Sequence, residues 1–220
     1  MNSPVVQLTN ITKRFGDVVA NNNVSLSVNS GEILSILGEN GSGKTTLMNM
    51  IAGIYRPDQG EILINGQNVE IHSPKDAYKY KIGMVHQHYK LVNVFTAAEN
   101  IILGQEGKQV LDMSAVKAEI SKISDAYGFK INLDQKIYDM SVSEKQTVEI
   151  IKVLFKGVDI LILDEPMNGL DKDGVKDMQN YLLDLKAKEK TIIIASHSSE
   201  DISILCDKVY EMDKGILTKK

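Results

Sequence analysis

The sequence is poor in cysteine, with Cys206 the only one in 220 residues. A single cysteine excludes a disulfide within the chain and fits a reducing compartment. No stretch approaches the roughly 18 apolar residues that a membrane-spanning helix needs. The opening stretch MNSPVVQLTN lacks the basic and apolar segments of a signal peptide, so we do not expect one there. A protein of this kind that works at a membrane must be held there by a partner.

An excess of positive charge is also lacking, because the formal net charge is −4. Domains that bind nucleic acid usually carry a strongly basic surface, so we expect no nucleic-acid partner. The sequence contains no internal repeat and no low-complexity tract. Its 43% hydrophobic and 25% charged residues are typical of an ordinary globular protein. A chain of this length buries enough surface to form a substantial core.

Three short runs are apolar almost throughout: ILSIL from Ile33, ILIL from Ile160 and TIIIA from Thr191. Strands that are covered on both faces have this composition, and such strands are usually parallel. Helical patterns lie between the runs, which predicts an α/β core. Residues 24–28 alternate apolar and polar, and residues 61–66 end in an Asn-Gly turn. These two segments predict a small antiparallel sheet near the N-terminus.

The middle of the sequence, residues 95–155, has helical patterns and no long apolar strand. Residues 114–128 carry apolar side chains at helical spacing and end at Gly128. Residues 141–157 have the same pattern and end at Gly157. We therefore predict one domain, in which a helical subdomain of residues 95–155 is inserted into a core of residues 1–94 and 156–220.

A glycine-rich segment, GENGSGKTT, separates the first of the apolar runs from a helical pattern. Gly38, Gly43, Lys44 and Thr45 match the phosphate-binding motif G-x-x-x-x-G-K-[ST]. Such a loop lets backbone N–H groups approach phosphate oxygens, and the following helix directs its positive end at them. The alternative is a glycine-rich turn with an exposed lysine.

Each residue of this segment has an expected role. Lys44 is expected to pair with the β- and γ-phosphates of a nucleotide, and the hydroxyl of Thr45 to ligate Mg²⁺. The other loop residues that we expect to contact the nucleotide are Glu39, Asn40, Gly41, Ser42 and Thr46.

Two carboxylates follow a second apolar run, in DILILDEP. Asp164 ends the predicted strand, where it can hold Mg²⁺ through water. Glu165 comes next, at the edge where open α/β sheets keep their ligands, and can polarise an attacking water. The alternative is a strand end with two solvated acids.

Together these residues resemble the ATPases of ABC transporters over nearly the whole chain. The resemblance implies ATP and Mg²⁺ as cofactors and a mainly parallel P-loop core. It implies that Phe15 stacks on adenine, that Gln87 contacts Mg²⁺ and links the core to the helical subdomain, and that His197 senses the γ-phosphate. Asp171 falls in the loop NGLD, through which paired ATPase domains communicate. A core phenylalanine and a structural histidine are the alternatives.

The sequence MSVSEKQ departs from the family signature Leu-Ser-Gly-Gly-Gln. Ser141 is kept, whereas Val142 and Ser143 replace the glycines and Glu144 replaces the glutamine. The resemblance implies that Ser141 faces ATP held by a second ATPase domain. Ser141 and Glu144 also form a capping box, so a simple helix start is the alternative. We expect the changed residues to weaken turnover more than ATP binding.

Residues 70–104 resemble ATPases of nucleoside and simple-sugar importers, many of which carry two such cassettes in one chain. The last third resembles single-cassette ATPases, so a fragment or composite of a longer protein is an option. The resemblance implies a peripheral subunit at the cytoplasmic face of the membrane, bound to transmembrane permease subunits at about residues 89–103 and driven by ATP-dependent dimerisation. The alternatives are a soluble ABC ATPase outside transport and a weakly hydrolysing subunit of a heterodimeric exporter.

Overall fold

The computed structural model describes residues 4–104 and 112–220, so residues 105–111 of the predicted helical subdomain and residues 1–3 of the predicted core lie outside it. An antiparallel sheet with the order β2–β1–β4–β5 lies near the N-terminus. Its strands are β1 (Val6–Phe15), β2 (Val18–Val28), β4 (Gln59–Ile64) and β5 (Gln67–Asn68). The two strands predicted at residues 24–28 and 61–66 are confirmed as parts of β2 and β4.

A second sheet has the order β10–β9–β3–β8–β7–β6, and all its neighbouring strands are parallel except the β9–β10 pair. Its strands are β3 (Ile33–Leu37), β6 (Ile82–Val85), β7 (Ile160–Asp164), β8 (Thr191–Ser196), β9 (Lys208–Asp213) and β10 (Ile216–Lys219). The three apolar runs are β3, β7 and β8, so their prediction as buried parallel strands is confirmed. The sequence interpretation did not name β6, β9 or β10.

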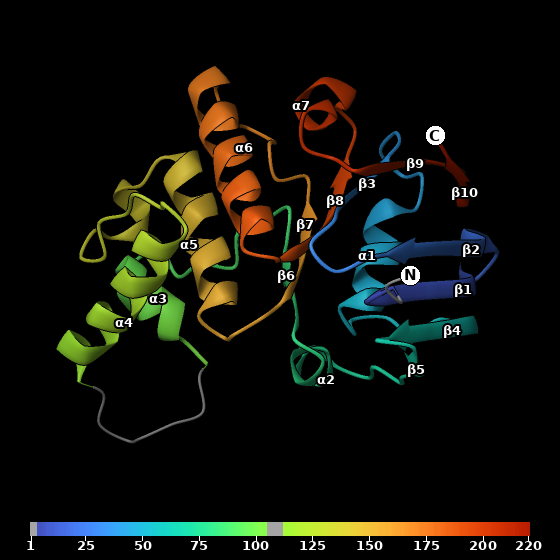
Figure 1. Cartoon of the computed structure of the whole chain (residues 1–220), viewed down its shortest axis with the longest axis horizontal. Coiled ribbons are helices and arrows are strands. Elements are labelled where there is room, and N and C mark those ends of the chain that lie inside the picture. Colours follow the sequence, from blue (N-terminus) through green and yellow to red (C-terminus); the bar gives the residue numbers. More distant parts are fainter. Residues whose placement is uncertain (1–3, 105–111) are drawn as a thin grey trace.

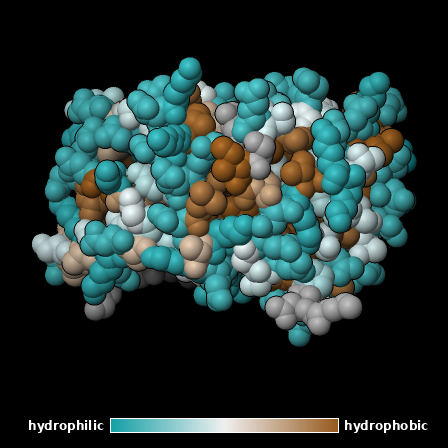
Figure 2. Space-filling view, turned by 45° about the horizontal axis from the view of Figure 1, so that its top comes forward, coloured by the Kyte–Doolittle hydropathy of each residue, from teal (hydrophilic) through white to brown (hydrophobic). Residues whose placement is uncertain are grey.

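Alternate side chains of the central strands serve two separate cores. Leu161 and Leu163 of β7 belong to one core, whereas Ile160 and Ile162 belong to the other. Each strand is therefore covered on both faces, which explains why these runs contain almost no polar residue. Most of the molecular face seen in Figure 2 is hydrophilic, and the largest group of apolar residues visible on it lies near its middle.

The helices divide between the two faces of the central sheet. They are α1 (Lys44–Ile51), α2 (Pro74–Lys79), α3 (Ala97–Ile102), α4 (Met113–Ala126), α5 (Val142–Leu154), α6 (Lys172–Ala187) and α7 (Ser199–Ser203), with a short 3₁₀ helix at Ile137–Asp139. In Figure 1, α1 lies between the two sheets, and α3, α4 and α5 gather on the opposite side of the central sheet. Among the described residues, no helix is both long and apolar enough to cross a membrane.

The predicted helices in the middle of the sequence are confirmed as α4 and α5. Helix α5 contacts α3 and α4 and also packs against β6 of the central sheet. The contact with β6 is close at Gly83, where a Cβ atom would lie 2.3 Å from Cγ1 of Val153. The subdomain bounds of 95 and 155 remain a prediction.

Candidate functional site

A cavity of about 350 Å³ opens beside the glycine-rich loop. The loop and the first turn of α1 supply one part of its lining, namely Asn40, Gly41, Gly43, Lys44, Thr45 and Thr46. Segments distant in sequence complete it: residues 18–20 of β2, Gln87 after β6, Glu165 after β7, and residues 214–215 between β9 and β10. The cavity therefore lies at the carboxyl end of parallel strands, where α/β folds bind their ligands.

The glycines of the loop are needed both for backbone conformation and for close packing. Gly43 has φ 112°, and a Cβ atom there would lie 2.2 Å from the carbonyl oxygen of Ala20. Gly41 has φ 82° and open space where a Cβ would point. These positive φ angles are ones that glycine adopts without strain. The loop thus lacks a side chain at Gly43 partly because β2 packs directly against it. The motif alone did not indicate this reason.

Lys44 lies inside the loop with only 4% of its surface exposed. Its ammonium group donates hydrogen bonds to the carbonyl oxygens of Gly38 at 2.6 Å and Glu39 at 3.1 Å. The carboxylate of Glu165 lies 3.6 Å away. Lys44 is therefore a buried cation that is bonded to oxygen atoms at the wall of the cavity. Anionic oxygens of a ligand in the cavity would form stronger, charge-assisted hydrogen bonds with it.

Thr45 and Asp164 place two oxygen donors next to each other. The hydroxyl of Thr45 donates a hydrogen bond of 3.3 Å to the carboxylate of Asp164. Burial raises the pKa of Asp164, the Thr45 hydrogen bond opposes this, and the nearby Glu165 carboxylate adds to the increase. Hard oxygen ligands suit Mg²⁺, which takes the rest of its coordination shell from water and phosphate. A cation here would favour the charged form of Asp164.

Glu165 is a buried carboxylate with an uncommon backbone conformation. It is 8% exposed, and its φ of 53° lies in the left-handed region that non-glycine residues seldom adopt. Its backbone N–H donates to the carbonyl oxygen of Ala195 in β8 at 2.9 Å, which fixes the residue to the neighbouring strand. Backbone strain of this kind clusters at functional sites.

His197 lies directly beside Glu165. Its Nδ1 is 2.7 Å from Oε2 of Glu165, and its backbone N–H donates to the same oxygen at 3.3 Å. The carboxylate is thereby oriented by an imidazole on one side and by Lys44 on the other. An oriented carboxylate in a cavity beside a lysine is able to accept a proton from water.

Gln87 lines the cavity, and the residues that follow it are attached to α5. The N–H of Lys90 donates a 2.6 Å hydrogen bond to the buried carboxylate of Glu149. The hydroxyl of Tyr89 donates to the carbonyl oxygen of Val142, at the start of α5, at 3.3 Å. The segment that follows Gln87 is therefore hydrogen-bonded to the helix that begins beside Ser141.

Eight expected site residues do not line this cavity. Gly38, Glu39 and Ser42 belong to the glycine-rich loop itself, and Asp164 and His197 are hydrogen-bonded to the lining residues Thr45 and Glu165.

The other three expected site residues, Phe15, Ser141 and Asp171, have partners elsewhere. The ring of Phe15 is 44% exposed and packs edge-on against Tyr55, with the ring centroids 5.2 Å apart. Ser141 caps α5, accepting a hydrogen bond from the N–H of Glu144 at 3.2 Å. Asp171 caps α6, accepting from the N–H of Gly174 at 2.8 Å. Their proposed roles in binding nucleotide remain predictions.

The cavity lining also includes residues that the sequence interpretation did not select. These are Val18, Val19, Ala20, Lys214 and Gly215. The sequence contains a turn signal at residues 213–215, Asp-Lys-Gly, between two strands. Nothing in its spacing connects that turn with a loop some 170 residues earlier, so only the tertiary structure brings the two together.

Comparison with known proteins gives consistent matches. The family model described as "ABC transporter" matches residues 21–168. The guanosine import ATP-binding protein NupO of Bacillus subtilis is 45% identical over 213 residues, which are 96% of this chain and 42% of that protein. The nucleoside import ATP-binding protein NupA of Lactococcus lactis is 42% identical over 216 residues, covering 97% of this chain and 43% of that protein. The chain thus spans less than half the length of these relatives.

Solved structures share the fold over almost the whole chain. The ADP conformation of MJ1267, an ATP-binding cassette of an ABC transporter, superposes with a TM-score of 0.88 at 28% identity, covering 98% of this chain and 90% of that one. The structure of cbiO1 from Clostridium perfringens, part of an ABC transporter complex, gives a TM-score of 0.84 at 27% identity, covering 98% and 87%. The predicted fold class, an α/β P-loop core with an antiparallel sheet and added helices, is confirmed.

Proposed function

Because this chain belongs to the ABC transporter family, we propose that its cavity binds MgATP and that the protein hydrolyses ATP to drive transport. Proteins of this family bind ATP. The observation that carries the proposal is that Lys44, Thr45 and Glu165 line one cavity. Asp164 is hydrogen-bonded to Thr45, and His197 is hydrogen-bonded to Glu165. These residues supply a buried cation, two neighbouring oxygen donors and an oriented carboxylate, which are the parts that phosphoryl transfer to water requires.

Each residue has a defined part in this mechanism. Lys44 balances negative charge on the β- and γ-phosphates, and backbone N–H groups of the loop hold the phosphate chain. Thr45 and Asp164 hold the Mg²⁺ ion, directly or through water, and the ion when bound neutralises phosphate charge. Glu165 accepts a proton from the attacking water, and His197 keeps its carboxylate in position.

We further propose that two ATPase domains pair, with Ser141 of each facing the nucleotide of the other. The N-terminus of α5 supports this assignment, because a helix N-terminus with a serine hydroxyl suits an anionic ligand. In the same assembly Phe15 would stack on adenine, and Asp171 would lie between the two domains. Transmembrane permease subunits would dock at about residues 89–103 and hold the protein at the cytoplasmic face of the membrane.

Nucleosides are the substrate class that we propose for the complete transporter. The printed names of the relatives NupO and NupA refer to guanosine and nucleoside import, and these proteins are 45% and 42% identical to this chain. A ribose import ATP-binding protein, RbsA of Caldanaerobacter subterraneus, is less similar at 37% identity. Uptake of radiolabelled guanosine and ribose by cells with and without the gene tests this part directly.

The binding proposal is tested by titrating ATP into the wild type and Lys44→Ala in the presence of Mg²⁺. We expect the variant to lose ATP binding, because the alanine removes the buried cation that faces the phosphates. Lys176→Ala on the exposed face of α6 is the matched control and should bind as the wild type does. Unchanged ATP affinity in Lys44→Ala, with both variants folded by circular dichroism, would refute the assignment of the cavity.

A second candidate function is a nucleotide-binding subunit with little turnover of its own. Its support is the changed signature, in which Val142, Ser143 and Glu144 replace the two glycines and the glutamine. Hydrolysis measured against protein concentration separates the two candidates. A homodimeric ATPase gains specific activity as concentration rises, whereas a subunit that needs a different partner stays inactive until that partner is added.

A further inference from the structure

The turn between β9 and β10 brings a lysine to the nucleotide cavity. Strand β9 ends at Asp213, β10 begins at Ile216, and these two residues pair across the hairpin. Lys214 has φ 45° and Gly215 has φ 80°, so both central residues lie in the left-handed region typical of tight two-residue hairpins. The turn therefore has a defined conformation, and the lysine is not on a long loop.

This turn is attached to the glycine-rich loop. The N–H of Gly215 donates a 2.8 Å hydrogen bond to the carbonyl oxygen of Ser42, in the middle of the loop. The carbonyl oxygen of Gly215 accepts a 2.8 Å hydrogen bond from the N–H of Asn22 in β2. A Cβ atom at Gly215 would lie 2.8 Å from the carbonyl oxygen of Ala20, so the contact depends on glycine. The position of Lys214 relative to the loop is consequently set by backbone contacts on both sides.

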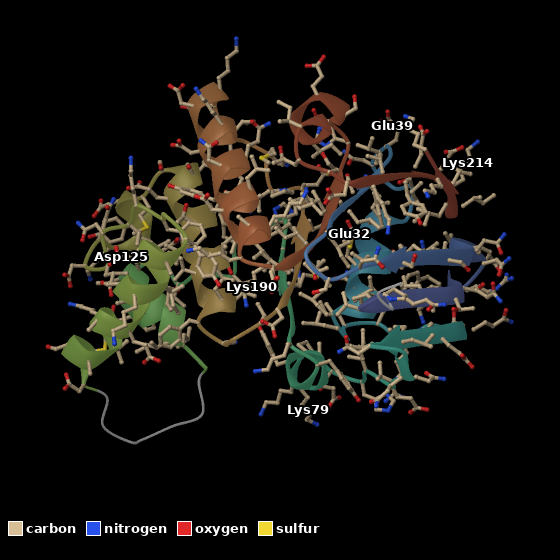
Figure 3. All side chains as sticks on the ribbon, in the orientation of Figure 1. Glu32, Glu39, Lys79, Asp125, Lys190 and Lys214 are labelled. Carbon is tan, nitrogen blue, oxygen red and sulfur yellow. The ribbon has the colours of Figure 1, made fainter. Side chains whose placement is uncertain are left out.

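The side chain of Lys214 has no partner within the described part of the chain. It is exposed, it lines the cavity, and it takes part in no hydrogen bond or ion pair with another described residue. Lys44, by contrast, is buried and bonded to loop carbonyl oxygens. Figure 3 shows Lys214 in the same region of the molecule as Glu39 of the loop. Two lysine ammonium groups therefore belong to the cavity. That of Lys44 is hydrogen-bonded to loop carbonyl oxygens, whereas that of Lys214 has no partner among the described residues.

We propose that Lys214, which lines the same cavity as Lys44, binds the α- and β-phosphates of the nucleotide. The backbone of a glycine-rich loop of this kind holds the α- and β-phosphates, whereas its own lysine reaches the β- and γ-phosphates. The backbone of the turn is bonded to Ser42 in that loop, so we assign the ammonium of Lys214 to the part of the phosphate chain common to ATP and ADP. The inference rests on the proposed binding of MgATP in this cavity.

Two properties follow from this placement. Lys214 does not distinguish ATP from ADP, because it contacts phosphates that both contain. Its contribution depends strongly on salt, because an exposed charge is screened over about 10 Å at 0.1 M ionic strength. Charges at the rim of a site act largely through the rate of association, so faster capture of nucleotide is the expected benefit.

The test is to measure the affinity and association rate of ATP, ADP and adenosine for the wild type, Lys214→Ala and Lys214→Arg at low and at high salt. We expect Lys214→Ala to bind ATP and ADP about threefold to fivefold more weakly at low salt, as for an exposed ion pair. The deficit should shrink at high salt, adenosine should bind equally to all variants, and Lys214→Arg should restore most of the affinity. Lys219→Ala, on the same hairpin and outside the cavity lining, should behave as the wild type.

Equal ATP and ADP affinities for Lys214→Ala and the wild type would overturn the proposal while leaving the cavity assignment intact. A loss that includes adenosine to the same extent would also overturn it, because the turn would then act on the shape of the site and not on phosphate. Failure of the wild type itself to bind ATP or ADP would instead refute the proposed function, and this inference with it.

Discussion

Nδ1 of His197 lies 2.7 Å from Oε2 of Glu165, and the two residues come from the ends of adjacent strands, β8 and β7. The other oxygen of the same carboxylate lies 3.6 Å from Nζ of Lys44. Glu165 therefore lies between the ammonium group of Lys44 and the imidazole of His197. This arrangement connects nucleotide binding with the group that we assign to water activation, and it leads to two predictions about hydrolysis.

Glu165→Gln should keep ATP bound and stop turnover. Glutamine has nearly the shape of glutamate and keeps a hydrogen-bonding oxygen for His197, but it cannot accept the proton of the attacking water. We expect phosphate release to fall by at least about a hundredfold, the usual size of a general-base contribution. Phosphate release and ATP titration on the same preparation measure the two effects. A variant that hydrolyses ATP at the wild-type rate would assign the base to another residue.

His197→Ala should lower the rate of hydrolysis with little change in ATP affinity. The alanine removes the Nδ1 contact with Glu165 while keeping the backbone N–H that also donates to it. We expect a decrease in kcat of about tenfold to a hundredfold, because a mispositioned base loses most of its advantage. His72→Ala, at the distant residue pair His72–Glu70, is the control. An unchanged kcat would assign His197 a purely structural role.

Glu144→Gln should raise the rate of hydrolysis if the altered signature limits turnover. The side chain of Glu144 accepts a 2.8 Å hydrogen bond from the N–H of Ser141, and glutamine retains this capping contact without the negative charge. We expect a gain of severalfold in kcat and an unchanged melting temperature. Glu144→Ala is the comparison, and it should lower the melting temperature because it removes the contact between the Glu144 side chain and the N–H of Ser141. No change in kcat for Glu144→Gln would show that charge at this position does not limit the reaction.

Asp76 should make the melting temperature of the protein fall more steeply as the pH is lowered. The ammonium of Lys79 and the hydroxyl of Ser73 donate hydrogen bonds to its carboxylate and lower its pKa from 3.8 to about 2. A lowered pKa in the folded state means that the stabilisation is present above pH 3.8 and is lost as the pH falls toward 2. Melting temperatures between pH 6 and pH 2 should thus fall less steeply for Asp76→Asn than for the wild type, and Lys79→Ala should shift the fall to higher pH. Parallel curves for all three proteins would contradict this.

The elements that were predicted from sequence are those with a strong local signal. The runs at Ile33, Ile160 and Thr191 are apolar on both faces because their alternate side chains enter two cores, so composition alone indicated buried parallel strands. By contrast, β6 has only four residues and includes Gly83, whose missing side chain makes room for α5. The glycine is explained by a contact with another element, and the local sequence pattern gives no information about that contact.

The sequence by itself determined the glycine-rich loop between an apolar strand and a helix, the carboxylates at Asp164 and Glu165 after a second strand, and the buried strands β3, β7 and β8. These features depend on neighbouring residues, whose spacing and conformational preferences are local properties. Only the tertiary structure decided that His197 orients Glu165 and that Lys214 stands at the edge of the same cavity. Parallel strands place their carboxyl ends side by side whatever the distance between them in sequence. The β9–β10 turn is held by backbone hydrogen bonds to Ser42 and Asn22, which are distant in sequence. Both relationships therefore depend on tertiary packing, which a local sequence pattern does not contain.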